Sequence, residues 1–359
     1  MVFQWLLRSF KACNYKGSAA SQSYLRYFYR GTWAAAYPET TGYIIETLYA
    51  YEDYVLSSKN DKFIADYQAL ISKYKPNSGQ SVTVESAEWI CDLQFPNGAL
   101  PGGKDKKSES AFNTGMMLFG LMQVHKKEKN IRCFEVAKKA TIWLSSIIDA
   151  EGNFISASYT DNYTPSYYTR ILWGMAIVNQ SMNDDMVAKA IKRAFIFFQK
   201  RQLPNGAFQH WGFEPQLAAH THTIAYTLRG LLESSQLFHD DSYLQSAQNL
   251  ALNLIETYKK DNRQLAGRYD TAWLGDHTYI CITGHAQVSF CLFRLYEITQ
   301  NIEYQMIAKE IFSTIANIPT RNGAIAGSKP FSGAYLPYHY PNWAAKFWLD
   351  AHMKYEQYS

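Results

Sequence analysis

A short turn motif recurs along the chain and constrains its fold more than any other feature. The pattern Gln-x-Pro-Asn-Gly-Ala occurs at residues 94–99 and again at residues 202–207. Shorter Gly-Asn and Asn-Gly versions occur at residues 151–154 and 321–325. Each follows a segment of helical periodicity, so each predicts a helix end and a tight turn that needs residues tolerant of positive φ. Four such turns predict one repeated architecture.

The segments on the two sides of these turns differ in character. Residues 134–144 and 190–200, which come before turns, have one apolar and one charged face. The segments after the turns are apolar nearly all round, which is typical of helices buried among others. With the first segment of this kind there are six: 43–55, 111–124, 167–178, 223–237, 282–295 and 343–352. Their starts lie about 55 to 70 residues apart, which fits a pair of helices and their loops.

This alternation predicts an all-α (α/α)6 toroid, with six inner and six outer helices in a single domain spanning residues 1–359. An open solenoid is the alternative, but its ends would need polar capping helices. The last apolar segment instead carries Trp343, Phe347 and Trp348. No strand-rich block is long enough for a second domain, and short extended pieces are expected only as hairpins or loops at the rim.

The composition excludes several classes of protein. Hydrophobic residues make up 47% and charged residues 18% of the chain, as in ordinary globular proteins. A net charge of +4 without a basic stripe argues against a nucleic-acid partner. The five cysteines are odd in number and lack Cys-x-x-Cys spacing, which indicates buried thiols in a reducing, cytoplasmic setting. The 27 tyrosines suit either a large helical core or a sugar-binding cleft.

The N-terminal segment is too short for a membrane span. Its apolar run covers residues 3–7, and Arg8 and Lys11 follow it, which is the wrong order for a signal peptide. We expect a helix that closes the fold. An amphipathic helix lying on a membrane surface is the alternative.

Polar residues gather at the starts of the six apolar segments. The stretch 37–43, Tyr-Pro-Glu-Thr-Thr-Gly-Tyr, opens the first of them. Pro38 suits the turn before a helix, and Thr40 or Thr41 is expected to cap the helix by accepting hydrogen bonds from its free N–H groups. In a toroid every inner helix begins on the same face. The residues at the six starts are therefore expected to converge on one cavity.

Residue types suited to acid–base chemistry or sugar binding are concentrated at these starts. The predicted catalytic residues are Tyr37, Glu39, His220, His222, Tyr226, Asp276 and His285. The predicted substrate-binding residues are Thr40, Thr41, Tyr43, Asn113, Tyr167, Tyr168, Arg170, Arg268, Tyr279, Tyr338 and His339. Alternatives stay open: Glu39 also suits a first-turn carboxylate favoured by the helix dipole, the tyrosines also suit packing, and the histidines also suit capping.

No metal or other cofactor is predicted. His220 and His222 are two residues apart, but no third ligand follows at a known spacing and no His-Glu-x-x-His run occurs. The aspartate pairs at 184–185 and 240–241 stand at the starts of outer helices. They are interpreted as helix caps rather than as the paired carboxylates of a glycosidase.

Three of these stretches resemble known proteins. The stretches 36–43 and 222–226 are similar to toroid proteins of bacterial surface-polysaccharide gene clusters, and this resemblance covers most of the chain. The Tyr-Pro-x-Thr pattern and the segment 270–287 resemble, more distantly, the helical catalytic domain of the D-glucuronyl C5-epimerases. Those epimerases carry Thr where this chain has Glu39, and their Thr-His segment lies on the last inner helix rather than the fifth. The resemblance implies a carbohydrate-active enzyme of polysaccharide biosynthesis.

The epimerase reaction suits these residue types. Inversion at C5 of a uronic acid requires a base on one face, an acid on the other, and a cation or hydrogen-bond donors for the carboxylate as it becomes an enolate. Tyrosines paired with histidines would supply the first two, and Arg170 or Arg268 would hold the carboxylate. A polysaccharide lyase, a glycoside hydrolase and a non-catalytic glycan-binding protein are the alternatives. Terpene cyclases and protein prenyltransferases share the toroid, but their Asp-rich metal motif is not found. The expected partner is a glycan or a sugar precursor.

Overall fold

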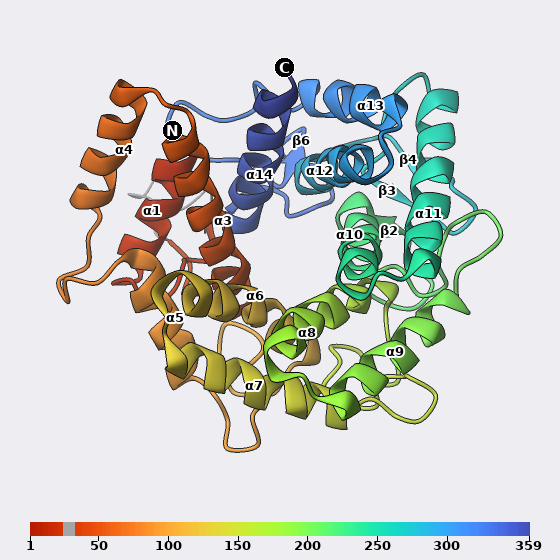
Figure 1. Cartoon of the computed structure of the whole chain (residues 1–359). Helices are drawn as coiled ribbons and strands as arrows, with labels where there is room; N and C mark the ends of the chain where they lie inside the picture. Colours follow the sequence, from red (N-terminus) through yellow and green to blue (C-terminus); the bar gives the residue numbers. More distant parts are fainter. Residues whose placement is uncertain (24–32) are drawn as a thin grey trace.

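The computed structural model describes residues 1–23 and 33–359, and this part of the chain forms a ring of helices (Figure 1). Within it, six inner helices pack each against the next, and the last packs against the first. They are α3 (Pro38–Ser57), α6 (Ala111–Glu128), α8 (Thr169–Met182), α10 (Thr221–Phe238), α12 (Ile282–Thr299) and α14 (Asn342–Tyr358). Each contains the core of one predicted apolar segment. The contact between α14 and α3 closes the ring and excludes the open solenoid.

The outer helices alternate with the inner ones along the chain (Figure 1). They are α1 (Val2–Ala12), α5 (Val82–Asp92), α7 (Ile131–Ser146), α9 (Asp185–Gln199), α11 (Asp241–Lys260) and α13 (Ile302–Ser313). A further helix, α4 (Asp61–Lys73), lies outside the ring beside α3 and was not predicted. The chain therefore adopts the expected (α/α)6 toroid fold.

The recurring turn motif, at four places, brings the end of one outer helix against the next outer helix around the ring: α5 against α7, α7 against α9, α9 against α11 and α13 against the start of α1. Gly206 has φ +78°, and a Cβ there would lie 2.6 Å from the carbonyl oxygen of Asn249 in α11. Gly98 and Gly152 also have positive φ and abut the backbone of α7 and α9 in the same way. Gly323 has φ +87° and abuts the carbonyl oxygen of Met1, 2.4 Å from the same hypothetical Cβ. The predicted positive φ is confirmed, and the close backbone contact explains why glycine stands at these turns.

The seam of the ring joins the two ends of the described chain. Strand β1 (Ser21–Ser23) pairs antiparallel with β7 (His339–Pro341), which leads directly into α14. The side-chain amide of Asn342 donates to the hydroxyls of Ser18 at 2.8 Å and of Thr40 at 2.9 Å. These contacts hold the start of α14 against the start of α3.

The remaining strands are two residues long and lie at the same rim. Strands β2 (Ala219–His220), β3 (Arg268–Tyr269) and β4 (Gly275–Asp276) form one antiparallel sheet in that order. Strands β5 (Ile280–Cys281) and β6 (Ser328–Lys329) form another pair. Because β2, β5 and β7 directly precede α10, α12 and α14, this rim fixes the starts of three inner helices.

Helix α1 belongs to the ring. Trp5, Leu6 and Phe10 are fully buried, and the helix packs against α14. This is the predicted closing helix, with its apolar face covered by protein. Across the described residues, no helix combines the length and the apolar character needed to cross a membrane. All five cysteines are free thiols, and four of them are buried.

The predicted helix caps are confirmed in one case and wrong in another. Asp184 accepts hydrogen bonds from the backbone N–H groups of Met186 and Val187 at the start of α9, and Asp240 caps α11 in the same manner. Neither threonine caps α3, because the helix begins at Pro38 and places both of them inside it. Their hydroxyls instead donate to the carbonyl oxygen of Tyr37.

Candidate functional site

A small cavity lies where the inner helices begin. Its volume is about 170 Å³, and its walls are mostly aromatic. The lining residues are Tyr37, Glu39, Thr40, Tyr43, Phe112, Tyr159, Tyr167, Phe213, His222, Tyr226, Tyr335 and Trp343. We call this space the mouth cavity. Seven of the predicted site residues line it: Tyr37, Glu39, Thr40, Tyr43, Tyr167, His222 and Tyr226.

Glu39 is the ionisable carboxyl group of this cavity. It sits in the first turn of α3 with 8% of its surface exposed. Burial raises its pKa to about 7, although a hydrogen bond with Tyr37 and the charge of Arg170 both act to lower the pKa. Both protonation states are therefore populated near neutral pH. Such a group can take a proton or give one in the same site.

A hydrogen-bonded group of polar side chains lies beside Glu39. The hydroxyls of Tyr37 and Tyr159 are 3.2 Å apart, and the amide of Asn113 donates to Tyr37 at 3.4 Å. Tyr159 in turn donates to the amide oxygen of Asn113. Burial raises the pKa of both phenols well above the usual tyrosine value. They therefore remain protonated and act as neutral hydrogen-bonding groups.

His222 enters the cavity from α10 as a neutral imidazole. Burial holds its pKa well below the usual value, and the charges of His220 and Arg170 act in the same direction. The side-chain amide nitrogen of Gln287 lies 2.6 Å from His222 Nδ1. The same nitrogen donates to the carbonyl oxygen of Thr283 at 3.4 Å, which fixes the orientation of the amide. His222 Nδ1 therefore accepts a hydrogen bond, and the proton of the neutral ring is on Nε2.

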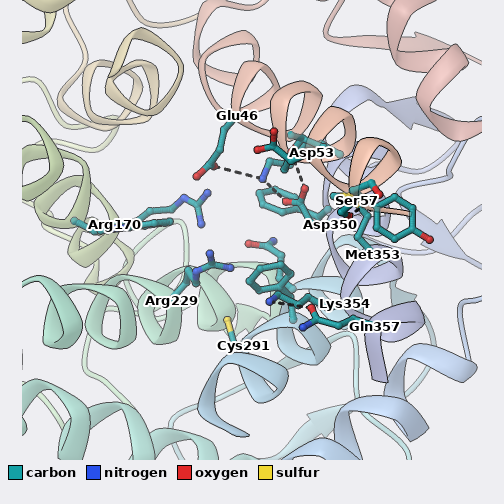
Figure 2. Close-up of a pocket in the computed structure, with 18 residues that line it drawn as sticks. Glu46, Asp53, Ser57, Arg170, Arg229, Cys291, Asp350, Met353, Lys354 and Gln357 are labelled. Atoms are coloured by element: carbon teal, nitrogen blue, oxygen red, sulfur yellow. Dashed lines mark hydrogen bonds and ion pairs between the residues drawn. The ribbon is translucent and has the colours of Figure 1, made fainter. Parts of the chain in front are cut away.

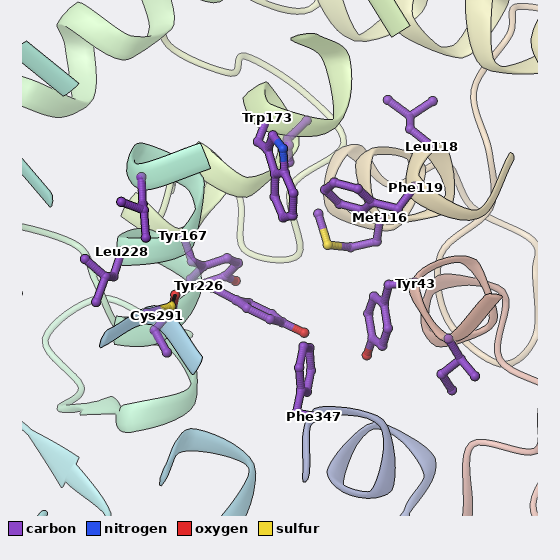
Figure 3. Packing of buried hydrophobic residues seen from close by; sticks show 14 of the residues in the cluster. Tyr43, Met116, Leu118, Phe119, Tyr167, Trp173, Tyr226, Leu228, Cys291 and Phe347 are labelled. Atoms are coloured by element: carbon purple, nitrogen blue, oxygen red, sulfur yellow. Dashed lines mark hydrogen bonds between the residues drawn. The ribbon is translucent and has the colours of Figure 1, made fainter. Parts of the chain in front are cut away.

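Two tyrosines approach each other across the centre of the ring. Figure 3 shows Tyr226 of α10 extending toward Tyr43 of α3, with Phe347 of α14 beside them. The ring of His222 lies 4.3 Å from that of Tyr226. The buried Tyr226 hydroxyl pairs with the Tyr43 hydroxyl in a hydrogen bond of poor geometry, which acts to lower the pKa of Tyr226 and to raise that of Tyr43. A weakly bonded buried hydroxyl retains capacity to bond a ligand.

Arg170 acts on the mouth cavity through its charge rather than by contact. Its guanidinium carbon lies 4.6 Å from the centre of the Tyr226 ring and 5.9 Å from that of Tyr43. The side chain is not part of the cavity wall. Its positive charge nevertheless lowers the pKa of both Glu39 and His222. The predicted direct contact between Arg170 and a carboxylate in this cavity is therefore not supported.

Other predicted residues lie next to the cavity or on its rim. His220 Nδ1 is 2.7 Å from the Tyr279 hydroxyl, and burial lowers the pKa of His220 to about 4. Arg268 and Asp276 form an ion pair with each other on β3 and β4, with Nε and Oδ2 3.0 Å apart. Tyr338 is exposed on the rim, and His339 follows it in β7.

The remaining predicted residues are buried for structural reasons. His285 is 2% exposed, and its Nδ1 bonds to the carbonyl oxygen of Cys281 at 3.0 Å. Burial lowers the pKa of His285 to about 4. Thr41 accepts a hydrogen bond from the backbone N–H of Ser18, and Tyr168 stacks on Phe112. His285, Thr41 and Tyr168 do not line the mouth cavity.

Several lining residues were not among the predicted catalytic and substrate-binding residues, although Tyr335 was among the residues expected at the start of the sixth inner helix. These are Phe112, Tyr159, Phe213, Tyr335 and Trp343. Phe112 and Trp343 stand in the first turns of α6 and α14. The rule that site residues stand at the starts of the inner helices therefore applies to them as well. Tyr159, Phe213 and Tyr335 lie in loops, where no periodic pattern signals which side chains face inward.

No metal-binding group accompanies these residues. Over residues 1–23 and 33–359, no set of three or more His, Cys, Asp or Glu side chains is placed to hold a metal ion. The titratable groups that line the mouth cavity are one carboxyl group, one neutral imidazole and several phenols.

Solved structures of the same fold are found among sugar enzymes, with low sequence identity. A heparin-specific unsaturated glucuronyl hydrolase superposes with a TM-score of 0.67 and 14% identity, covering 99% of this chain and 97% of its own. A family 105 glycoside hydrolase from C. acetobutylicum gives 0.62 and 12%, covering 89% and 94%. The cellobiose 2-epimerase of Spirochaeta thermophila gives 0.61 and 12%, covering 81% and 83%. No protein-family model and no curated protein sequence matches the chain. At these identities the similarity establishes the (α/α)6 toroid fold.

Proposed function

We propose that this protein is a carbohydrate-active enzyme that transfers a proton at C5 of a uronate residue, in a glycan or a surface-polysaccharide precursor. The observation that carries the proposal is Glu39, a carboxyl group with a pKa of about 7 inside an aromatic cavity. A group that titrates near neutral pH is suited to removing a proton in one step and returning it in another.

The rest of the mouth cavity suits a sugar ring. Aromatic faces offer apolar contact to the C–H faces of a pyranose, and phenols bind its hydroxyls. A volume of about 170 Å³ is below the range typical of drug-sized ligands, so the cavity takes about one sugar unit at a time. This supports a substrate that presents a terminal uronate or a short precursor.

The neutral donors around Glu39 suit an enolate. Removal of the C5 proton places negative charge on the uronate carboxylate, and donors aimed at that charge lower the barrier. His222 Nε2–H and the Tyr226 hydroxyl are such donors. In the proposed reaction Glu39 takes the C5 proton from one face, and the Tyr226 hydroxyl gives a proton to C5 from the other while His222 donates a hydrogen bond to the enolate. Proton exchange with water then returns Glu39 and Tyr226 to their starting states.

Hydrolysis of an unsaturated uronide is the second candidate. It is favoured by the similarity to a structure described as an unsaturated glucuronyl hydrolase, which spans 99% of this chain. Addition of water across a C4–C5 double bond begins with a proton donated to carbon. The protonated form of Glu39 supplies such an acid at neutral pH.

One experiment in D2O separates these reactions. The protein is incubated with oligosaccharides that carry glucuronate at the chain end or within the chain, where C4 bears a glycosyl leaving group, and with 4,5-unsaturated counterparts. Products are followed by NMR and by the ultraviolet absorbance of the double bond. Deuterium at C5 of an intact saturated glycan supports epimerisation. A new double bond identifies a lyase, and loss of an existing one with chain cleavage identifies the hydrolase. If neither set of oligosaccharides changes, the proposed proton transfer is refuted. A non-catalytic glycan-binding protein is then the remaining interpretation.

A matched pair of variants assigns the chemistry to Glu39. Glu39→Gln removes the ionisable group while keeping the side-chain shape, and we expect turnover to fall at least about 100-fold. Glu85→Gln makes the same change in the first turn of the outer helix α5. Turnover should be unchanged in this control. Equal turnover in the two variants would exclude Glu39 as the acid–base group.

A further inference from the structure

A second and larger cavity lies on the other side of Arg170 from the mouth cavity. Its volume is about 710 Å³, within the range of sites for small-molecule ligands. It is lined from the later turns of α3, α12 and α14 and from α8 and α10 (Figure 2). We call it the rear chamber. Nothing in the proposed reaction uses it.

The rear chamber contains two arginines from neighbouring inner helices. Figure 2 shows Arg170 of α8 and Arg229 of α10 extending into it from one side. Arg170 is only 2% exposed, and its Nε makes no hydrogen bond to any described residue. Its surroundings are aromatic: among the described residues, the rings within 6 Å of its guanidinium carbon are those of Tyr43, Phe119, Trp173, Tyr226 and Phe347.

A buried guanidinium whose N–H donors are not all hydrogen-bonded is expected to bind an anion. Aromatic faces stabilise its charge in part, but they do not satisfy its N–H donors, and burying a charge without full compensation is costly. A planar guanidinium fits a carboxylate or phosphate in two-point geometry. Arg170 is thus a buried donor in the wall of this cavity whose Nε has no hydrogen-bond partner among the described residues.

Arg229 is the second arginine in the lining, and a carboxylate partly neutralises its charge. Its Nε lies 2.7 Å from Glu233, and Glu233 is also held by Arg294 through two hydrogen bonds of 3.0 and 3.1 Å. Arg294 is also paired with Glu297, so the two arginines face two carboxylates, and among the described residues Arg170 is the cation of this wall that has no carboxylate partner. Lys346 adds a further cation to the lining, although it is paired with Asp350.

Other lining groups suit the uncharged part of a sugar. Trp173 and Phe290 give apolar surface beside the arginines, since the Arg229 guanidinium carbon lies 4.1 Å from the centre of the Phe290 ring and 5.0 Å from that of Trp173. Glu46 and Asp350 add carboxylate acceptors for hydroxyl groups. Glu46 approaches Lys346 only to 4.0 Å, so its carboxylate retains free acceptor capacity.

From this arrangement we propose that the rear chamber binds a sugar acid or a sugar phosphate, with its anionic group held by Arg170 and Arg229. The shared chemistry is one anionic group on a hydroxylated ring. The site is separate from the mouth cavity and does not depend on the function proposed for that cavity.

Calorimetric titration of the full chain tests this directly. The probes are D-glucuronate for a carboxylate, glucose 6-phosphate for a phosphate, and glucose as the neutral counterpart. We expect one of the two anions to bind, and glucose to bind at least about tenfold more weakly, because charge-assisted hydrogen bonds are lost. The stronger anion identifies the group that the chamber prefers. Failure of both anions to bind at millimolar concentration overturns the proposal.

Variants locate the binding. Arg229→Gln removes one guanidinium while Glu233 keeps its bonds to Arg294, and we expect anion affinity to fall at least about tenfold. Arg263→Gln is the matched control, since Arg263 pairs with Glu310 on the outer helix α13. Ala50→Trp fills the chamber from an exposed position on α3 without removing a charge, and it should abolish binding even where Arg229→Gln fails to fold.

The outcomes separate this site from the mouth cavity. D-glucuronate binding that survives both Arg229→Gln and Ala50→Trp must occur elsewhere, and that result overturns the rear-chamber proposal while leaving the proposed function intact. Binding that is lost in both variants and kept in Glu39→Gln supports the rear chamber, whatever the turnover assays show.

Discussion

The side-chain amide of Gln287 on α12 donates to Nδ1 of His222 on α10, with the two nitrogens 2.6 Å apart. One inner helix thereby sets the tautomer of a residue on its neighbour. Because Nδ1 accepts, the imidazole presents Nε2–H as a donor while remaining neutral. In the proposed reaction Glu39 is then the base in its ionised form, and His222 is a hydrogen-bond donor.

Gln287→Glu should reverse this arrangement. A carboxylate accepts a hydrogen bond, so Nδ1 would carry the proton, and the added negative charge would raise the pKa of His222. We expect turnover to fall about 100-fold. The 15N chemical shifts of His222 report the tautomer directly. Gln300→Glu, at the exposed C-terminal end of the same helix, is the control. An unchanged tautomer in Gln287→Glu would contradict the proposed role of the amide.

Glu39→Gln should make the protein more stable at high pH while abolishing turnover. Burial raises the pKa of Glu39 from 4.5 to about 7, so the folded state holds this proton more tightly than the unfolded chain. Its contribution to stability is present below pH 4.5 and is lost as the pH rises through about 7. Relative to pH 4, the variant should gain about 3 kcal/mol over the wild type at pH 8. Urea unfolding at the two pH values measures this difference, and a gain that does not depend on pH would argue against a buried titrating carboxyl group.

His285→Gln should reduce the sensitivity of the fold to acid. Burial lowers the pKa of His285 from 6.5 to about 4, so its contribution to stability is present above pH 6.5 and is lost as the pH falls toward 4. The unfolding free energy of the variant should therefore decline less steeply over this interval than that of the wild type. A steep loss of turnover with unchanged acid unfolding would instead assign His285 to the chemistry.

Gly323→Ala should weaken the contact between the turn that follows α13 and the start of α1. The residue has φ +87°, and an added Cβ would lie 2.4 Å from the carbonyl oxygen of Met1. Gly79→Ala is a matched control, with φ +83° and no atom within 4 Å of the added carbon. The control should lose only the roughly 1–2 kcal/mol of the backbone conformation, and Gly323→Ala should lose clearly more. Thermal unfolding of both variants makes the comparison, and equal losses would show that the contact with Met1 contributes nothing.

The sequence was sufficient to predict the ring of helices but not the direction in which each side chain points. Repeated turns and all-round apolar segments are periodic signals, and they predicted all six inner helices. The rule that site residues stand at helix starts found Glu39, His222 and Tyr226. It cannot tell apart neighbours in one turn, because residues two positions apart point to nearly opposite sides of a helix. Gln287 therefore reaches His222, while His285 bonds to its own helix start.

Long side chains and loops account for the other differences. Arg170 stands at the start of α8, as predicted, but its side chain extends away from the mouth cavity and into the rear chamber. Tyr159 and Phe213 reach the cavity from loops whose paths depend on tertiary contacts rather than on local sequence. That residues 1–359 form a single domain remains a prediction.

The seam has a consequence for the order of folding. Most neighbouring inner helices are also neighbours along the chain, so those interfaces form from nearby segments. Asn342 and Ser18, by contrast, are 324 residues apart in sequence. Contacts of such long range form slowly, because a large loop must close first. During synthesis, the face of α3 that packs against α14 stays exposed until the last inner helix is made. The contact between the rings of Tyr43 and Phe347 can form only then. Rate-limiting closure and early aggregation should both originate at this interface.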